Sequence, residues 1–330
     1  MKNKKTTTFL PEELKSLSEK ELLSFYDNPR NIPVNDCRNE EWENSEADFP
    51  EHCLVFLTHG SFAVNEQIRR ITDLTKTQFL RLIRNYSDFW TRKMTKKSGI
   101  PDDNVLCFPW SRAIWDPNRE YKNEEEDLEL DQWKKYIRDH DFNEQVIIKK
   151  PWQFRDTWKS KTELYHSVIS SKLELAELLR GWSIWIDIHD TWVNLMNVDP
   201  ELDTIKEEWF PDMIIWTKDW ESCNPEILDF FVERLNHYLW LKIYTNKLYK
   251  WWYVTTRHWK EYREELNDWD WLKKSKRNLI QVELGRYLYM KESTQEVDWE
   301  RMEIIWEWIK RAITDLWLEF WKEYFEKLNR

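Results

Sequence analysis

Short continuous apolar runs, separated by stretches with helical spacing, constrain the fold of this 330-residue chain more than any other feature. Three such runs stand out, at residues 53–58 (CLVFLT), 183–188 (SIWIDI) and 278–284 (NLIQVEL). Runs of this length that are apolar on both faces are typical of strands buried in a parallel sheet. Because helical segments separate the strands, the sequence predicts an α/β protein with a mainly parallel sheet.

Shorter segments complete the expected fold. Further strands are expected at residues 104–108 and 213–215, with another candidate at 112–115. Apolar residues recur at helical spacing in four regions, residues 65–95, 161–179, 224–235 and 298–330. The fold class that we expect is α/β, in three α/β/α layers around a mixed, mainly parallel sheet; the pattern itself predicts the α/β class and the mainly parallel sheet.

The chain divides into three parts by composition. Residues 1–50 are expected to form a helical appendage and a polar, acidic linker, because Asp27-Asn28-Pro29 ends a short helical pattern. Residues 51–297 are expected to form the α/β domain. Residues 298–330 read as one long helix that packs on this domain.

Charge and hydropathy exclude some classes of protein. With 50 Lys and Arg against 61 Asp and Glu, the net charge of −11 argues against a nucleic-acid binder that neutralises phosphates. No run of 18 or more apolar residues occurs, so we expect no membrane-spanning helix. The cysteines lie far apart without a CxxC pair, which predicts reduced thiols and a cytoplasmic protein.

The balance of tryptophan and glycine is abnormal. The chain has 24 Trp and 4 Gly, whereas ordinary glycine usage predicts roughly 23 Gly in a chain of this length. One explanation is that many of these tryptophans stand where the organism reads a UGA codon as glycine. The other is a Trp-rich protein that binds membrane interfaces or carbohydrate. Recoding predicts Trp at turn positions that require Gly, whereas a Trp-rich binding protein does not.

Polar residues follow or end the apolar runs. His59 follows the first run, His189 follows the second, and Glu283 lies within the last. In open α/β sheets, ligands bind beyond the carboxyl ends of the strands. Two His and a carboxylate are the components of a hydrolytic zinc site. For any one of these His residues, a structural role in the core is the alternative.

A second cluster of polar residues lies just after the predicted strand at residues 104–108. Arg112, Asn118 and Arg119 fall within eight residues of one another. The planar guanidinium of Arg binds a carboxylate through two parallel hydrogen bonds. We therefore expect a clamp for an anionic substrate, with ordinary surface ion pairs as the alternative.

Seven short motifs, in order along most of the chain, resemble those of the N-formylglutamate amidohydrolases, also called N-formylglutamate deformylases. They are residues 57–61 (LTHGS), 88–91 (DFWT), 111–119 (SRAIWDPNR), 187–191 (DIHDT), 211–223 (PDMIIWTKDWESC), 246–258 (NKLYKWWYVTTRH) and 281–290 (QVELGRYLYM). This family is related in fold to zinc carboxypeptidases, so the resemblance implies a phosphorylase/hydrolase-like fold.

The resemblance also implies a site. It implies one metal, zinc, held by His59, His189 and a carboxylate, for which Asp88 is the first choice and Glu66 the alternative. By analogy with the carboxypeptidases, Glu283 would be the general base. The substrate's carboxylates would be held by Arg112, Asn118 and Arg119, with Arg257 as a further cation.

The activity implied by the resemblance is hydrolysis of N-formyl-L-glutamate, a small anionic substrate, to formate and L-glutamate. A related zinc hydrolase that cleaves another N-acyl amino acid or a peptide-like amide is the first alternative. A non-catalytic Trp-rich binding protein is the second.

The same comparison bears on the tryptophans. Seven of them fall where the family has Gly, at Trp110, Trp192, Trp216, Trp220, Trp251, Trp252 and Trp259. We expect such tryptophans to adopt left-handed backbone angles or to fill space that the substrate needs.

Overall fold

The computed structural model describes the parts of the chain that carry the sheet and its main helices. The described residues are 53–61, 75, 77, 87–111, 117–118, 155–191, 211–217, 221–246, 257–258, 277–291 and 294–328. The predicted appendage at residues 1–50 and the candidate strand at 112–115 lie outside them, as does most of the helical region predicted at 65–95. The proposed division of the chain at residues 50 and 297 therefore stays a prediction.

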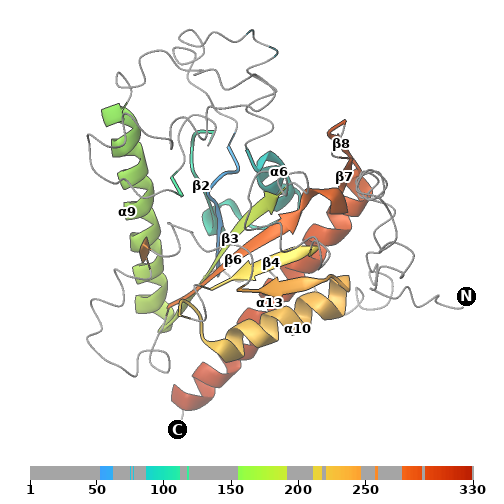
Figure 1. Cartoon of the computed structure of the whole chain (residues 1–330). Helices are drawn as coiled ribbons and strands as arrows, with labels where there is room; N and C mark the ends of the chain where they lie inside the picture. Colours follow the sequence, from blue (N-terminus) through green and yellow to red (C-terminus); the bar gives the residue numbers. More distant parts are fainter. Residues whose placement is uncertain are drawn as a thin grey trace, which may run out of the picture.

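A mixed six-stranded sheet forms the centre of the molecule, in the order β2-β1-β3-β6-β4-β5 (Figure 1). The strands are β1 (Cys53–Leu57), β2 (Val105–Cys107), β3 (Ser183–Thr191), β4 (Met213–Trp216), β5 (Ile243–Thr245) and β6 (Arg277–Gly285). Strands β2, β1, β3 and β6 are parallel, whereas β4 runs antiparallel to β6 and parallel to β5. The expected mixed, mainly parallel sheet is confirmed.

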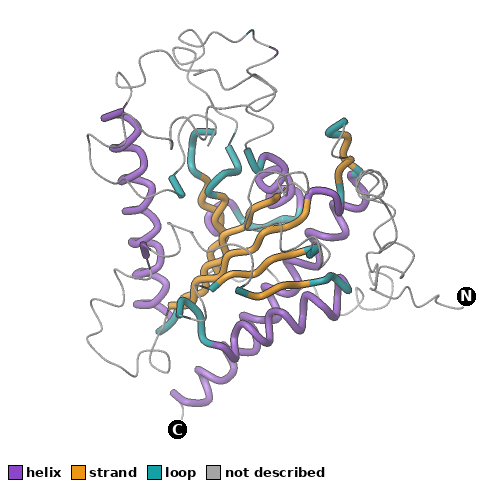
Figure 2. The backbone as a smooth tube through the Cα atoms, viewed as in Figure 1, coloured by secondary structure: helices purple, strands orange, loops and turns teal. Residues whose placement is uncertain are grey.

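Helices cover both faces of the sheet (Figures 1 and 2). They are α6 (Phe89–Lys97), α9 (Arg155–Arg180), α10 (Pro225–Leu239) and α13 (Trp299–Leu328). Helix α9 lies on one side, and α10 and α13 lie together on the other, so the predicted three layers are present. The short helix η3 (Asp102–Asn104) precedes β2, and η8 (Arg286–Leu288) leads from the carboxyl end of β6 into a hairpin of β7 (Met290–Lys291) and β8 (Glu296–Val297).

Three of these helices match the sequence predictions. Helices α9, α10 and α13 correspond to the patterns at residues 161–179, 224–235 and 298–330. Helix α10 begins where the sequence places a cap, because the side chain of Asn224 accepts a hydrogen bond from the backbone N–H of Glu226. None of the described helices is long and apolar enough to cross a membrane.

The two faces of the sheet have different roles. On one face, alternate residues such as Val55, Ile186 and Val282 join α10 and α13 in the main apolar core. On the other face, Phe56 packs against Trp185, with ring centroids 4.3 Å apart. Beyond Trp185, the same alternation places polar residues of β3 and β6, Asp187 and Gln281 first among them, on this second face, toward the carboxyl ends of the strands.

Candidate metal centre

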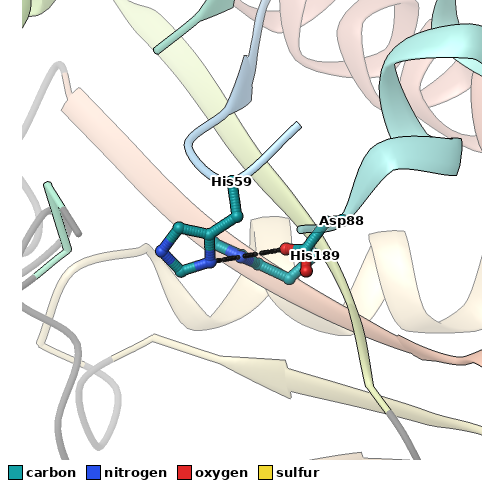
Figure 3. A group of neighbouring side chains, drawn as sticks. All are labelled: His59, Asp88 and His189. Carbon is teal, nitrogen blue, oxygen red and sulfur yellow. Dashed lines mark hydrogen bonds and ion pairs between the residues drawn. The ribbon is translucent and has the colours of Figure 1, made fainter. Parts of the chain in front are cut away.

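Three buried side chains converge at the carboxyl end of the sheet (Figure 3). His59 follows β1, Asp88 immediately precedes α6, and His189 lies in β3. The backbone N–H of Asp88 donates to the carbonyl oxygen of His59 at 2.9 Å, which ties the first two segments together. Each of the three residues is at most 1% exposed. The predicted convergence of two His and a carboxylate at the strand ends is therefore observed.

The donor atoms face one another at short range. His189 Nδ1 lies 3.0 Å from His59 Nδ1 and 2.9 Å from Asp88 Oδ2. His59 Nδ1 lies 3.4 Å from the same carboxylate oxygen. A tetrahedral zinc ion with bonds near 2.0–2.2 Å places its ligand atoms about 3.3 Å apart. The three donors, two imidazoles and one carboxylate, thus fit a zinc ion in spacing and in chemistry.

The electrostatics of the cluster favour a charged pair. Burial alone would raise the pKa of Asp88, but hydrogen bonds from His189 and His59 outweigh it and hold that pKa well below its usual range. Burial would lower the pKa of His189, but the charge of Asp187 and hydrogen bonds to Asp187 and Asp88 raise that pKa well above 6.5. Without a metal, a proton on His189 therefore balances the carboxylate charge.

Asp187 approaches the opposite side of the His189 ring. Its Oδ2 lies 3.1 Å from His189 Nε2. Its other oxygen accepts a hydrogen bond from Thr58 Oγ1 at 2.8 Å. The Thr58 hydroxyl is in turn 3.3 Å from the hydroxyl of Tyr165, on α9. Contacts between buried polar groups thus connect α9 to the candidate metal ligands.

A buried arginine, Arg286, contacts Asp88 and the residue before it. It lies at the start of η8, is 2% exposed, and donates from Nη2 to the carbonyl oxygen of Ser87 at 2.9 Å. Its Nη2 is 3.5 Å from Asp88 Oδ1, and its Nε pairs with Asp190. The hydroxyl of Tyr289 donates to Asp190 at 2.9 Å. Burial raises the pKa of Asp190 to about 6, although the charge of Arg286 opposes the rise.

Glu283 lies next to these ligands in the sheet. In the register of β3 and β6 it is directly opposite His189, so the two side chains project from the same face. It is 6% exposed, and its Oε1 accepts a hydrogen bond from Gln281 Nε2 at 3.3 Å. Glu283 is thus a buried carboxylate beside the candidate metal ligands.

The substrate-binding residues that we expected are less completely described. Asn118 is fully buried, while Arg112, Arg119 and the alternative ligand Glu66 lie outside the described residues. Arg257 forms a two-pronged ion pair with Glu163 on α9, with N–O distances of 3.2 and 2.9 Å. Its guanidinium is thus engaged by the protein.

Of the seven tryptophans that fall where the family has Gly, called the motif tryptophans below, two are described, and neither has a positive φ. Trp216 ends β4, is 4% exposed, and pairs with Gln281 across the antiparallel ladder. Its side chain therefore shares the face that carries Glu283. Trp240, outside the motifs, has left-handed angles of φ 52° and ψ 38° where it caps α10. The other five motif tryptophans lie outside the described residues.

Sequence reasoning missed the roles of Asp187 and Arg286. Asp187 interrupts an otherwise apolar strand, and a charged residue inside a buried run is a signal that it has a partner. Arg286 is a charged residue directly after a buried strand, which is a similar signal that it has a partner. Neither signal identifies the partner, because the contacts join segments 96 to 199 residues apart in the sequence.

Comparisons with known proteins bear on the family and the fold of this chain. The family model described as N-formylglutamate amidohydrolase matches residues 52–290. A crystal structure of N-formylglutamate amidohydrolase from Ralstonia eutropha JMP134 superposes with a TM-score of 0.57 at 17% identity, covering 86% of this chain and 96% of the other. A gene product of Agrobacterium tumefaciens gives a TM-score of 0.48 at 11% identity, covering 87% and 94%.

No curated protein sequence matches the chain. At 17% identity the superposition shows a shared fold, whereas the family match extends over most of the chain, from the segment before His59 to the end of the motif that holds Glu283. The chain belongs to the N-formylglutamate amidohydrolase family.

Proposed function

We propose that this chain hydrolyses N-formyl-L-glutamate to formate and L-glutamate with one divalent metal, zinc. The observation that carries the proposal is the convergence of His59, Asp88 and His189, beside Glu283, at the carboxyl end of the sheet. Family membership supports amide hydrolysis, and the donor set supports zinc, because imidazole and carboxylate ligands with an open position are typical of hydrolytic zinc sites.

Glu283 is the proposed general base and acid. His59, Asp88 and His189 would hold the zinc ion, which would act as a Lewis acid that lowers the pKa of water toward about 7 and polarises a carbonyl group. Glu283 takes a proton from the attacking water and passes it to the amide nitrogen as the C–N bond breaks. Its burial beside His189 supports this role, since a proton acceptor must lie within hydrogen-bond reach of the reacting group.

Binding of the substrate's two carboxylates is assigned to Arg112, Asn118 and Arg119. The formyl amide is small, so most of the binding free energy must come from the carboxylates, which then position the reacting carbon. The ion pair of Arg257 with Glu163 favours a role for Arg257 in holding its own segment on α9.

We further propose that the seven motif tryptophans stand where the natural protein has glycine through UGA recoding. For Trp216, the support is the volume that its side chain occupies, because its backbone φ is not positive. It lies on the same face of the sheet as Gln281 and Glu283, so an indole there occupies volume next to the proposed base. Glycine at this position would leave that volume to the substrate.

A substrate panel tests the proposal. The rate of hydrolysis is measured for N-formyl-L-glutamate, N-acetyl-L-glutamate and N-formyl-L-alanine with the zinc-loaded protein. We expect N-formyl-L-glutamate to give the largest kcat/KM. N-formyl-L-alanine should bind more weakly, because its side chain is neutral, and N-acetyl-L-glutamate should react more slowly, because its acyl group is larger. A preference for the acetyl substrate would select the related N-acyl hydrolase instead.

The non-catalytic alternative makes a different prediction. A Trp-rich binder needs tryptophans gathered on one exposed face. Among the described residues, Trp240 and Trp299 are exposed at 38% and 36%, whereas four tryptophans are buried: Trp185, Trp216, Trp306 and Trp308. If none of the panel substrates is hydrolysed by zinc-loaded protein, the proposed activity is wrong and this alternative returns.

A further inference from the structure

The two nitrogens of the His189 ring face different partners. Nδ1 points into the candidate metal centre, 3.0 Å from His59 Nδ1 and 2.9 Å from Asp88 Oδ2. Nε2 lies 3.1 Å from Asp187 Oδ2, away from the other two ligands. Asp187 and His189 are two residues apart on β3, so their side chains share one face of the sheet.

Which nitrogen carries the proton decides whether His189 can bind a metal. A neutral imidazole has one N–H and one lone pair, and a metal needs the lone pair. If the proton rests on Nδ1, the lone pair points away from His59 and Asp88. A group that favours the proton on Nε2 therefore makes the site competent for binding.

We propose that Asp187 is a positioning residue that keeps the His189 proton on Nε2 and so reserves the Nδ1 lone pair for the metal. Asp187 is 1% exposed, and a buried carboxylate oxygen requires a donor. Apart from the contact with His189, no group among the described residues donates a hydrogen bond to its Oδ2. The His189 N–H is the donor that this oxygen is placed to use.

Asp187 is itself held in position. Thr58 Oγ1 donates to its Oδ1 at 2.8 Å, and the Thr58 hydroxyl lies 3.3 Å from that of Tyr165. All three residues are buried, at 4% exposure or less. Thr58 directly precedes the candidate ligand His59. The same short segment therefore positions His59 and, through the Thr58 hydroxyl, orients Asp187.

The decisive variant is Asp187→Asn. The amide oxygen keeps the hydrogen bond from Thr58, and the amide N–H then faces His189 Nε2 in place of an acceptor. We expect the proton to move to Nδ1 and the dissociation constant for zinc, measured by competition with a chromophoric chelator, to rise about 10- to 100-fold. In ¹⁵N-histidine spectra recorded with both proteins at the same zinc concentration, His189 should show the Nε2–H pattern in the unchanged protein and a larger share of the Nδ1–H pattern in Asp187→Asn.

A matched control separates positioning from stability. Glu177 pairs with Arg277 at 2.6 Å at the other end of β6, so Glu177→Gln also removes a partly buried charge contact. It should lower the melting temperature but leave zinc affinity unchanged. Unchanged zinc affinity together with an unchanged His189 ¹⁵N pattern in Asp187→Asn would overturn the proposal.

A second variant covers the case in which Asp187→Asn fails to fold. Thr58→Val removes the hydroxyl that orients Asp187, and it should weaken zinc binding to a smaller extent than Asp187→Asn. Zinc affinity equal to that of the unchanged protein would contradict the proposal.

The inference rests on the metal site of the proposed function. Because zinc binding is measured apart from hydrolysis, failure of the inference can be told from failure of the proposed reaction. Zinc binding that depends on Asp187, in a protein without hydrolytic activity, would support the inference and refute the proposed reaction. A failure of the unchanged protein to bind zinc would refute both the metal site and this inference.

Discussion

Replacing Glu283 by Gln separates proton transfer from metal binding. Gln is nearly isosteric with Glu but cannot accept the proton of a water. Because Glu283 is proposed as the base and not as a ligand, kcat should fall about 10²- to 10⁴-fold while bound zinc, measured by atomic absorption, stays unchanged. Loss of zinc would instead make Glu283 a ligand. Glu233→Gln, on the exposed side of α10, is the control and should change neither quantity.

The pH dependence of zinc binding follows from His189. Its raised pKa means that the metal-free protein gains stability from the His189 proton below about pH 6.5 and loses it as pH rises through the raised value. Zinc must displace that proton, so its stabilising effect should grow as pH rises. The difference in melting temperature between zinc-loaded and metal-free protein should therefore increase from about pH 6 to about pH 8.5.

His237→Gln is the control for this experiment, since His237 lies on α10. It should keep the trend, whereas His189→Gln should remove the zinc effect at every pH. A difference in melting temperature that does not vary with pH would contradict the coupling between the proton and the metal.

At the residue scale, the sequence predicted the ligands better than their supports. The sequence named His59, Asp88 and His189 as candidate ligands because strand ends and motifs mark them, and the structure brings these three side chains together. Asp187 was quoted only as part of a motif, because its partners Thr58 and His189 become neighbours only when β1 and β3 pair. The ion pair of Arg257 could not be predicted either, since it joins two segments far apart in the chain.

The end of helix α10 gives a prediction at the scale of one element. Trp240 caps the helix with left-handed angles, and its N–H donates to the carbonyl oxygen of Asn236 at 3.0 Å. Glycine is the usual residue at such a position, because a Cβ atom is strained there. We expect the Trp240→Gly protein to be more stable than the Trp240→Ala protein by about 1 kcal/mol in chemical denaturation.

The same pair of substitutions at Trp216 is the control. Trp216 lies in β4 with an ordinary backbone angle, so Ala there should be at least as stable as Gly. Equal stability of Gly and Ala at residue 240 would contradict the strained cap. The codon at each position, read in the gene, decides separately whether the natural residue is glycine.

At the element scale, length decided what the sequence could predict. The nine-residue strands β3 and β6 and the long helices α9 and α13 carry enough apolar residues to show their period. Strand β5 has three residues, Ile243–Thr245, and was missed. The antiparallel direction of β4 was not predictable, because an apolar run reads alike in both directions.

The tryptophan question is a property of the whole molecule. A version of the chain with Gly at residues 192, 216, 220, 251 and 252 should melt at a higher temperature and hydrolyse N-formyl-L-glutamate faster than the printed sequence. Overpacking costs about 1–3 kcal/mol per site, and several such sites would consume much of a fold's marginal stability. Equal melting temperature and equal activity in the two versions would show that the tryptophans are native.

The central claim is that one zinc ion at His59, Asp88 and His189 makes this chain an amidohydrolase. The most direct measurement is formate release from N-formyl-L-glutamate by chelator-treated protein as zinc is added back, in both the glycine version and the printed sequence. We predict that activity is absent without metal, rises linearly and stops rising at one zinc per chain, and that Asp88→Asn stays inactive at that zinc level. Full activity in the metal-free protein would contradict the account.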